Sequence, residues 1–386
     1  MFSILRLNTI SASGLNEFDL DKYCIIDDCE NPDAIIMRSH NINDWEFPET
    51  LACIARAGAG VNNIPVDRCT DRGVVVFNTP GANANAVKEL TLAALFLASR
   101  GIIEGSNWVQ GLKGCGNVET QMEKGKAAFG GHEIADKAIG VIGLGAIGIQ
   151  VANACYALGM TVYGYDPYLS VDSAWRLSRW VVKAADMREI FRKCDYITIH
   201  VPLTPEARHM IGHDAFLNMK KGVTLINIAR GDLVDNEALL EAVKTGKVER
   251  YVTDFPSEDL LGVQGIITIP HLGASTKESE DNCARAAAHR IVDFLEYGNI
   301  KDSVNFPECE LAYTGKQRLC ITHQNVPRVV SSVTAEIGEA GLNIDNMINK
   351  SRDKVAYTII DLDSGDLGEI VSRISAMEAI LKVRCI

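Results

Sequence analysis

The amino-acid sequence predicts an α/β protein that combines two parallel-sheet regions with a small C-terminal βαββαβ module. Three observations carry this prediction. Short apolar, β-rich runs alternate with helical or polar segments at the start of the chain. A second and stronger alternation begins at residue 138, and the order of predicted strands and helices changes again after residue 316. Near-continuously apolar runs that alternate with helices are typical of strands buried on both faces of a parallel sheet.

The first region contains five predicted strands, at residues 3–7, 23–27, 33–39, 51–58 and 73–79. A long helical pattern from 84 to 110 follows, and then a Gly- and Lys-rich loop through Gly131. The second region contains six predicted strands, at residues 138–143, 161–166, 196–201, 223–229, 250–255 and 265–270. Helix-like segments separate most of these strands, which predicts a doubly wound parallel sheet.

A helix predicted over 278–298 and a polar, Pro-containing linker lead into the last region. There the pattern predicts strand, helix, two strands, helix and strand, at residues 318–322, 329–341, 343–349, 354–362, 366–377 and 381–386. This order is that of a ferredoxin-like βαββαβ module.

The composition argues against several classes of partner. The net charge is −12 and the basic residues are scattered among acids, so we expect neither a nucleic-acid nor a membrane partner. The eleven cysteines are dispersed and form no CxxC pair, which favours reduced thiols in a cytoplasmic protein and predicts no metal site. No apolar run approaches membrane-spanning length.

The segment GVIGLGAIG carries the most specific local motif. Gly143, Gly145 and Gly148 have G-x-G-x-x-G spacing between a predicted strand and a predicted helix, and Asp166 closes the next strand about twenty residues on. Such glycines allow a tight turn and a close approach of the backbone to a pyrophosphate. The carboxylate of Asp166 would accept hydrogen bonds from ribose hydroxyls and repel a 2′-phosphate, which favours NAD over NADP. The alternative is a glycine turn that only packs a helix.

Polar side chains follow the ends of three predicted strands: Arg230, the acids Asp254 and Glu258, and His271. In a doubly wound sheet the carboxyl ends of the strands line the ligand site. A guanidinium there can bind a planar carboxylate through two hydrogen bonds. A Glu258–His271 pair would be an acid/base catalyst for hydroxyl–carbonyl interconversion. The alternatives are a structural ion pair for Arg230, a capping histidine and a surface glutamate.

The chain resembles the D-isomer-specific 2-hydroxyacid dehydrogenase family in the segments GLGAIG, GYDP, HVPLTPEARHMI, LINIARGDLVDNEAL, DFPSE and PHLGAST. Its C-terminal module resembles an ACT domain in the segment ITHQNVPRVVSSVTAEIGEAGLNID. The family resemblance implies an NAD-dependent oxidoreductase that forms a homo-oligomer, a dimer or tetramer. The combination with an ACT domain is similar to members that act on a phosphorylated 2-hydroxy acid, with L-serine as a candidate effector. Two alternatives are another dehydrogenase of the family, such as a glyoxylate/hydroxypyruvate reductase or a D-lactate dehydrogenase, and an NAD-responsive corepressor.

The resemblance implies a role for each candidate residue. Arg230 would bind the substrate carboxylate and keto oxygen, His271 would carry the proton, and Glu258 would support His271. Asp254 looks like the acid that holds the nicotinamide carboxamide. Thr253 is the alternative for this role, because the segment DFPSE is one residue shorter than the commoner family motif. The implied cofactor-binding residues are Gly143, Gly145, Ala146, Ile147, Gly148, Asp166, His200, Val201, Pro202, Ile228, Ala229, Arg230, Asp254, His271 and Gly273. The implied substrate-binding residues are Arg38, Ser39, Ala59, Gly60, Asn83, Lys126, Arg230 and His271.

The resemblance also implies domain boundaries. A discontinuous, flavodoxin-like substrate domain would comprise residues 1–97 and 283–306, and a Rossmann-type cofactor domain residues 98–282. A linker would span 307–316 and the ACT domain 317–386. The matching effector positions in the ACT domain are His323, Asn325 and Asn343. Two residues depart from the usual motifs: Ala59 replaces a threonine, and Arg328 replaces a glycine.

Overall fold

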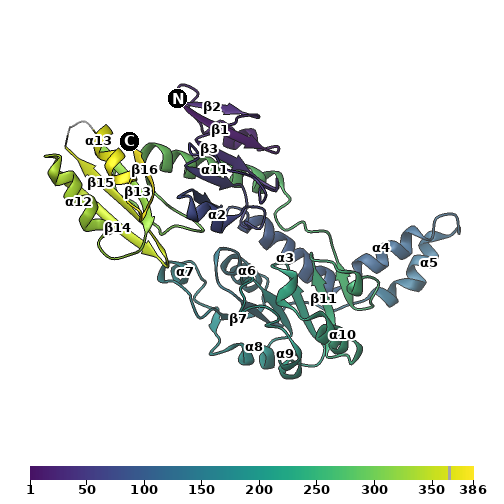
Figure 1. Ribbon diagram of the computed structural model, residues 1–386. Helices are drawn as coiled ribbons and strands as arrows, with labels where there is room; N and C mark the ends of the chain where they lie inside the picture. The colour runs from purple at the N-terminus through teal and green to yellow at the C-terminus, as the bar shows by residue number, and fades with distance from the viewer. Residues whose placement is uncertain (364–366) are drawn as a thin grey trace. The chain divides into compact units, whose positions relative to one another are not determined.

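The computed structural model describes residues 1–363 and 367–386, which fold into two compact units (Figure 1). Unit 1 comprises Met1–Asn83 and Lys277–Ile386, and unit 2 comprises Ala84–Thr276. Unit 2 therefore begins before the boundary predicted at residue 98 and ends before the one predicted at residue 282. As a result, helix α3 (Ala84–Ser99) belongs wholly to unit 2 and helix α11 (Lys277–Tyr297) wholly to unit 1.

Unit 2 is built on a doubly wound parallel sheet, as predicted. The strand order is β12-β11-β10-β9-β6-β7-β8, and each neighbouring pair runs parallel. The strands are β6 (Ala138–Ile142), β7 (Thr161–Tyr165), β8 (Val182–Lys183), β9 (Tyr196–Ile199), β10 (Val223–Asn227), β11 (Val248–Thr253) and β12 (Ile266–Thr268). The order reverses between β6 and β9, and ligands of such sheets bind beyond the carboxyl ends of the strands at this point. The two-residue edge strand β8 was not predicted.

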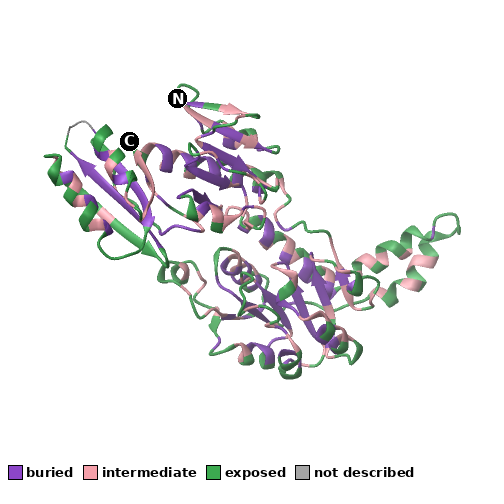
Figure 2. Cartoon of the chain, viewed as in Figure 1, coloured by how far each residue is buried: buried purple, intermediate pink, exposed green. Residues whose placement is uncertain are grey.

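Helices cover both faces of this sheet, which is why its strands are apolar on both sides. One core joins the sheet to α8 (Met187–Lys193), α9 (His213–Asn218) and α10 (Asn236–Lys244). The other core joins it to α3 and α6 (Ala146–Ala157). All five residues of β10 are buried between them, as Figure 2 shows for the centre of the sheet. The short helix α7 (Val171–Trp175) and the 3-10 turns η2 (Gly231–Leu233) and η3 (Glu258–Leu260) complete the unit.

The long helix predicted over 84–110 is two helices, and the loop predicted after it contains a third. Gly101 caps α4 (Ile102–Gln110) and so separates it from α3. Helix α5 (Val118–Gly125) and the 3-10 turn η1 (Lys126–Phe129) lie where the Gly- and Lys-rich composition predicted a loop. Residues 102–129, all of them described, form an arm in which α4, α5 and η1 bury no side chain (Figure 2).

Unit 1 contains a five-stranded parallel sheet of order β2-β1-β3-β4-β5, the order of flavodoxin-like folds. The strands are β1 (Phe2–Leu7), β2 (Tyr23–Ile26), β3 (Ala34–Met37), β4 (Cys53–Arg56) and β5 (Val75–Phe77). α11 covers one face of this sheet, and α2 (Val66–Asp71) covers the other. The short helix α1 (Ala12–Leu15) packs against α11.

The predicted βαββαβ module is confirmed at the C-terminus. It consists of β13 (Gln317–Gln324), α12 (Val329–Glu339), β14 (Ile344–Arg352), β15 (Val355–Leu362), α13 (Gly368–Ser375) and β16 (Ile380–Cys385). Its antiparallel sheet has the order β14-β15-β13-β16. Asp366, where the last helix was predicted to begin, lies outside the described residues. Among the described residues no helix has the length and apolar composition to cross a bilayer.

The module caps the C-terminal end of α11. Arg384 donates to Phe294 O and Leu295 O, both at 3.1 Å, and Tyr357 Oη donates to Gly298 O at 2.7 Å. Cations favour helix C-termini because the last carbonyls there lack helical partners. One face of the module's sheet therefore packs on α11 within unit 1, and α12 and α13 cover the other face.

Candidate active site

Asp166 holds the glycine-rich turn between β6 and α6. Leu144 N donates to Asp166 Oδ2 at 2.8 Å, and Tyr168 N donates to Asp166 Oδ1 at 2.8 Å. Gly143 N donates to Tyr165 O at 2.9 Å. The predicted ribose acceptor is therefore also a brace between the turn and the end of β7.

Two glycines of this turn leave no room for a side chain. Gly143 has a φ of +91°, and a Cβ there would lie 2.5 Å from His200 O and 2.8 Å from Val201 Cγ1. A Cβ on Gly148 would lie 1.8 Å from Gly143 O. At Gly145, apart from the glycine itself and its two chain neighbours, no atom of the described residues lies within 4 Å of the Cβ position. This open space at the start of α6, beside Ala146 and Ile147, fits the close approach of a pyrophosphate.

His200 follows β9 and presents an uncharged ring near the turn. Its Nε2 lies 2.9 Å from Thr198 Oγ1, and its Nδ1 has no hydrogen-bond partner among the described residues. Burial lowers the pKa of His200 to about 4, so the imidazole is neutral near pH 7. Val201 lies against Gly143, and Pro202 continues the exposed loop beyond it.

Arg230 lies in a turn beyond β10 that Asn227 braces. Asn227 is fully buried; its Nδ2 donates to Arg230 O at 2.8 Å and its Oδ1 accepts from Ala229 N at 3.1 Å. Arg230 Nη1 donates to Ala229 O at 2.6 Å, and Ile228 is buried beneath the turn. In the part of the chain that the structure describes, no acid forms an ion pair with Arg230. This argues against the structural ion pair. Sequence reasoning missed Asn227, although it directly precedes the IAR segment.

Asp254, beyond β11, is the buried acid of the site, with 1% of its surface exposed. Its Oδ2 accepts from Gly273 N at 3.2 Å, and its Oδ1 has no hydrogen-bond partner among the described residues. Burial raises the pKa of Asp254, and the positive charges of His271 and Arg230 oppose this effect. Thr253 Oγ1 already accepts from Phe255 N at 3.1 Å. Asp254 thus keeps one carboxylate oxygen without a hydrogen-bond partner among the described residues, whereas the Thr253 hydroxyl is already engaged.

His271 lies beyond β12 and contacts an aromatic ring. The centroids of the His271 and Phe255 rings are 4.6 Å apart, with an interplanar angle of 50°. Glu258 is exposed at the start of η3. Within residues 1–363 and 367–386 no hydrogen bond or ion pair joins Glu258 to His271. The predicted Glu258–His271 pair is thus not formed in this conformation, and the contacting group is Phe255, which sequence reasoning missed.

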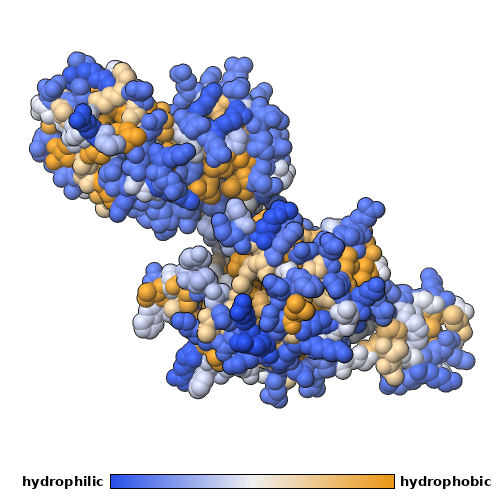
Figure 3. All heavy atoms as spheres, turned by 60° about the horizontal axis from the view of Figure 1, so that its bottom comes forward, coloured by the Kyte–Doolittle hydropathy of each residue, from blue (hydrophilic) through white to orange (hydrophobic). Residues whose placement is uncertain are grey.

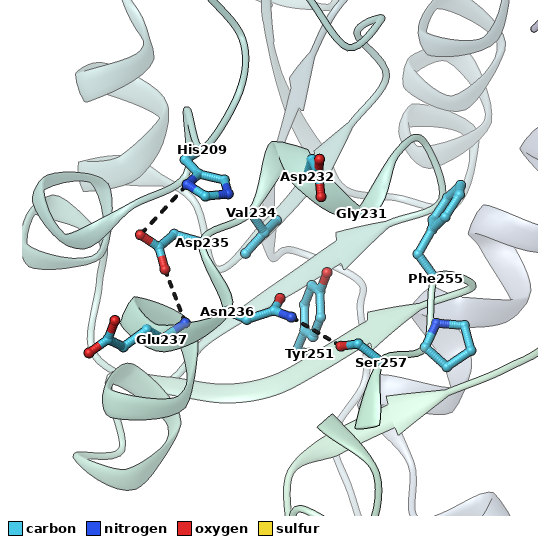
Figure 4. A pocket seen from close by; sticks show the side chains of 11 residues that line it. His209, Gly231, Asp232, Val234, Asp235, Asn236, Glu237, Tyr251, Phe255 and Ser257 are labelled. Carbon is cyan, nitrogen blue, oxygen red and sulfur yellow. Dashed lines mark hydrogen bonds and ion pairs between the residues drawn. The ribbon is translucent and has the colours of Figure 1, made fainter. Parts of the chain in front are cut away.

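A pocket of about 390 Å³ adjoins these loops (Figure 4). Its wall includes Gly231, next to Arg230, and Phe255. The opposite side is polar, with His209 4.0 Å from Asp235. None of the predicted cofactor-binding residues lines this pocket.

The predicted substrate-binding residues other than Arg230, His271 and Lys126 belong to unit 1. Arg38 follows β3, and its Nη1 lies 2.7 Å from Glu280 Oε1 in the first turn of α11. Arg56, which the sequence analysis missed, ends the neighbouring strand β4 and donates from Nε to Arg38 O at 2.9 Å. Two guanidinium-bearing residues thus share the carboxyl edge of this sheet.

The remaining unit 1 candidates surround that edge. Ser39 N donates to Asn8 Oδ1 at 3.1 Å, and Ala59 O accepts from Asn78 Nδ2 at 2.7 Å, beside Gly60. Asn83 is the last residue before α3.

Lys126 lies in the arm of unit 2, at the start of η1. Its Nζ is 2.5 Å from Glu123 Oε2, and both side chains are exposed. An exposed ion pair of this kind contributes little to stability.

The predicted effector residues do not form one cluster within the chain. His323 is buried; its Nδ1 lies 2.8 Å from Gln324 O and its Nε2 lies 2.9 Å from Thr358 Oγ1. Asn325 Nδ2 donates to Asp353 O at 3.1 Å, at the same end of the sheet. Asn343 lies at the other end of the sheet. Strands β13 and β14 both pair with β15, but Gln324 of β13 pairs with Val355 at the start of β15, whereas Ile344 of β14 pairs with Leu362 at its end.

Comparison with known proteins shows which family and which proteins the chain is similar to. Residues 92–273 match the family model described as the D-isomer-specific 2-hydroxyacid dehydrogenase, NAD binding domain. A D-3-phosphoglycerate dehydrogenase of Methanocaldococcus jannaschii is 35% identical over 306 residues, which cover 77% of this chain and 56% of that protein. The protein of the same name from Archaeoglobus fulgidus is 38% identical, over 72% of this chain and 52% of that protein. The chain thus spans about half the length of these two curated relatives.

Other matches extend further along both chains. The D-3-phosphoglycerate dehydrogenase of Haemophilus influenzae is 29% identical over 98% of this chain and 93% of that protein. Among solved structures, the NAD⁺-bound 3-phosphoglycerate dehydrogenase of Entamoeba histolytica matches with a TM-score of 0.61 and 26% identity, covering 79% of this chain and 98% of that one. The matched segment contains the glycine turn, Asp166, Arg230 and His271, and residues 92–273 therefore belong to the NAD-binding domain family of the D-isomer-specific 2-hydroxyacid dehydrogenases.

Proposed function

We propose that the chain is an NAD-dependent dehydrogenase that interconverts D-3-phosphoglycerate and 3-phosphohydroxypyruvate, the first step of phosphorylated L-serine biosynthesis. The observation that carries this proposal is the buried Asp254, whose remaining oxygen lies among the loops that bear Arg230 and His271. The names of the curated relatives support the substrate.

The proposed roles follow from the chemistry of each group. The planar guanidinium of Arg230 binds the substrate carboxylate and keto oxygen through paired hydrogen bonds. His271 takes the hydroxyl proton in oxidation and returns it in reduction. Asp254 would orient the carboxamide of a bound NAD, a cofactor that would supply the hydride acceptor for carbon 2. Glu258 supports His271 only after a movement that brings the two side chains together.

The phosphate is assigned to unit 1. Arg38 and Arg56 occupy adjacent positions at the carboxyl edge of the sheet, because Arg56 pairs in register with Met37. Arginine forks match the oxygens of a phosphate group. Ser39, Ala59, Gly60 and Asn83 supply the surrounding turns, and Lys126 is proposed as an additional phosphate ligand. On the boundaries that the structure gives, this assigns residues 1–83 and 277–306 of unit 1 to substrate binding.

The test is a comparison of substrates by NADH absorbance. Phosphohydroxypyruvate should exceed hydroxypyruvate, glyoxylate and pyruvate in kcat/KM by at least about 100-fold, because a polar site built for phosphate rejects ligands that lack it. A preference for glyoxylate or hydroxypyruvate would replace this substrate with that of another dehydrogenase of the family. NAD binding without turnover of any of these acids would favour the corepressor.

The C-terminal module is proposed to be an ACT domain that senses L-serine. Its βαββαβ order supports this assignment. Because Asn343 lies at the opposite end of the sheet from His323 and Asn325, one site that uses all three residues requires two modules. Titration of L-serine against phosphohydroxypyruvate reduction, in the intact chain and in His323→Ala, tests the effector. An intact chain that neither binds serine in calorimetry nor slows at millimolar serine would contradict it.

A homo-oligomer is proposed to form through the arm of residues 102–129. Ile102, Val109 and Val118 are each more than a third exposed there, and apolar atoms gather on the arm in Figure 3. Exposed apolar surface of this kind marks interaction sites. Light scattering of the intact chain and of Val109→Glu tests whether the arm forms the oligomer.

The eleven free thiols support a reducing compartment, the cytoplasm.

A further inference from the structure

The three loops that bear the proposed catalytic groups converge on one side chain, Phe255. Its ring lies against the imidazole of His271, with centroids 4.6 Å apart. Its Cβ lies 3.3 Å from the position that a Cβ would take at Gly231, the residue after Arg230. Phe255 therefore touches the His271 loop on one side and the Arg230 loop on the other, and Figure 4 shows it beside Gly231.

The backbone around Phe255 is itself anchored. Phe255 N donates to the hydroxyl of the buried Thr253 at 3.1 Å. The preceding residue, Asp254, accepts from Gly273 N at 3.2 Å, two residues beyond His271. The histidine loop is thus attached to the end of β11 by a backbone hydrogen bond and by a ring contact. In the described part of the chain, Glu258 adds no bond to His271.

We propose that Phe255 is a positioning residue that holds the imidazole of His271 in the orientation required for proton transfer relative to Arg230. This inference rests on the roles proposed above for Arg230 and His271. Proton transfer needs heavy atoms within about 3.2 Å. His271 is otherwise exposed, and its ring forms no hydrogen bond among the described residues. A flat aromatic ring at a centroid distance of 4.6 Å restricts rotation of the imidazole by contact. A Cβ at Gly231 would lie 3.3 Å from Phe255 Cβ and 3.8 Å from Phe255 Cγ, so the two loops are closely packed at this point.

The test compares Phe255→Leu, which keeps an apolar side chain but loses the ring, with Phe255→Tyr, which keeps the ring. Phe255→Leu should lower kcat for keto-acid reduction by about 10- to 100-fold, because small errors of placement cost that much. The KM for the keto acid and the Kd for NADH should change less than about twofold. Phe255→Tyr should retain most of the kcat. Equal losses in the two variants, or an unchanged kcat in Phe255→Leu, would overturn the proposal.

A second measurement separates this inference from the proposed substrate. Kinetics are run with whichever of phosphohydroxypyruvate, hydroxypyruvate and glyoxylate the unmodified chain reduces best, so the substrate ranking and the variant ratio are independent results.

The imidazole C–H signals are also recorded by NMR in the NAD-bound protein, with His271→Ala as the assignment standard. Phe255→Leu should shift the His271 signal by removing the ring current, whereas Phe96→Leu, a half-exposed phenylalanine of the same unit, should not. An unmoved His271 signal in Phe255→Leu would refute the contact whatever the enzyme reduces.

Discussion

Arg38 Nη1 lies 2.7 Å from Glu280 Oε1, so the cation proposed for the substrate phosphate is paired with an acid at the start of α11. The side chains are 37% and 44% exposed, and such exposed pairs contribute little to stability. Glu280 would nevertheless place a negative charge close to any phosphate that Arg38 binds.

We therefore expect Glu280→Gln to lower the KM for phosphohydroxypyruvate. Removing one like charge at short range in water is worth about 1 kcal/mol, or roughly fivefold in affinity. The KM for hydroxypyruvate, which lacks the phosphate, should change much less. Initial rates with both keto acids check this, and a KM for phosphohydroxypyruvate that rises would show that Glu280 orients Arg38 instead of competing for it.

Arg230→Lys keeps the positive charge but loses the planar fork. We expect kcat/KM for the keto acid to fall by about 100-fold or more, because a point charge cannot hold the carboxylate and the keto oxygen in fixed positions. NADH affinity, measured by fluorescence titration, should stay nearly unchanged. If NADH binding collapses while turnover per bound NADH persists, Arg230 has a structural role.

Asp166→Asn tests the choice between NAD and NADP. The amide oxygen can still accept from Leu144 N or Tyr168 N, so the turn should stay folded. The negative charge that opposes a 2′-phosphate is lost. We expect a strong preference for NADH in the unmodified chain and a loss of about tenfold or more of that preference in Asp166→Asn. Equal kcat/KM values for NADH and NADPH in the unmodified chain would contradict the prediction.

His200 predicts a pH dependence of stability. Burial lowers its folded-state pKa to about 4, below the unfolded value of about 6.5. Between these values the unfolded chain binds more protons, so stability rises with pH and is lost as the pH falls through this window. From pH 8 to pH 5.5 the contribution amounts to roughly 1.5 kcal/mol. Urea unfolding at both pH values should show this loss in the unmodified chain and a smaller one in His200→Gln; equal losses would assign the dependence to other groups.

The sequence predicted those features that depend on local pattern. Strands of the two parallel sheets were predicted because burial on both faces leaves continuous apolar runs, and the glycine turn was predicted because its spacing reflects contacts within about twenty residues. α5 was missed because a Gly- and Lys-rich segment without a buried face has no apolar periodicity. The break at Gly101 was missed because a glycine inside a helical pattern is often tolerated.

The site contacts that were missed are tertiary. The ring of Phe255 reaches His271 across the fifteen residues of chain between them, which include η3 and β12, and no pattern in either segment encodes the approach. Arg56 meets Arg38 only because β3 and β4 pair in register. The motif carried Glu258 and His271 as a pair, yet their side chains are apart here, because a motif specifies the residues of a reaction and not the rotamers of one conformation.

The final prediction concerns the joint between the C-terminal module and α11. Arg318 and Asp361 are both fully buried, and Arg318 Nε donates to Asp361 Oδ1 at 2.6 Å. The same guanidinium donates to Tyr297 O at 2.7 Å and to the linker carbonyls of Leu311 and Ala312 at 3.0 Å. Arg318→Met would leave the Asp361 carboxylate without its partner in the interior, at a cost of about 3–5 kcal/mol.

The double variant Arg318→Met/Asp361→Leu separates the contribution of the ion pair to stability from that of the hydrogen bonds between Arg318 and the backbone carbonyls. A buried pair replaced by apolar residues of similar size is often neutral for stability, so the double variant should recover most of the loss if the pair alone matters. The three carbonyls that Arg318 serves would still lack their donor, and an acceptor that water does not reach costs about 1–3 kcal/mol when it is left unsatisfied. We therefore expect only partial recovery in urea unfolding. Full recovery would mean that water replaces the guanidinium at Tyr297, Leu311 and Ala312, and that the linker is not held by Arg318.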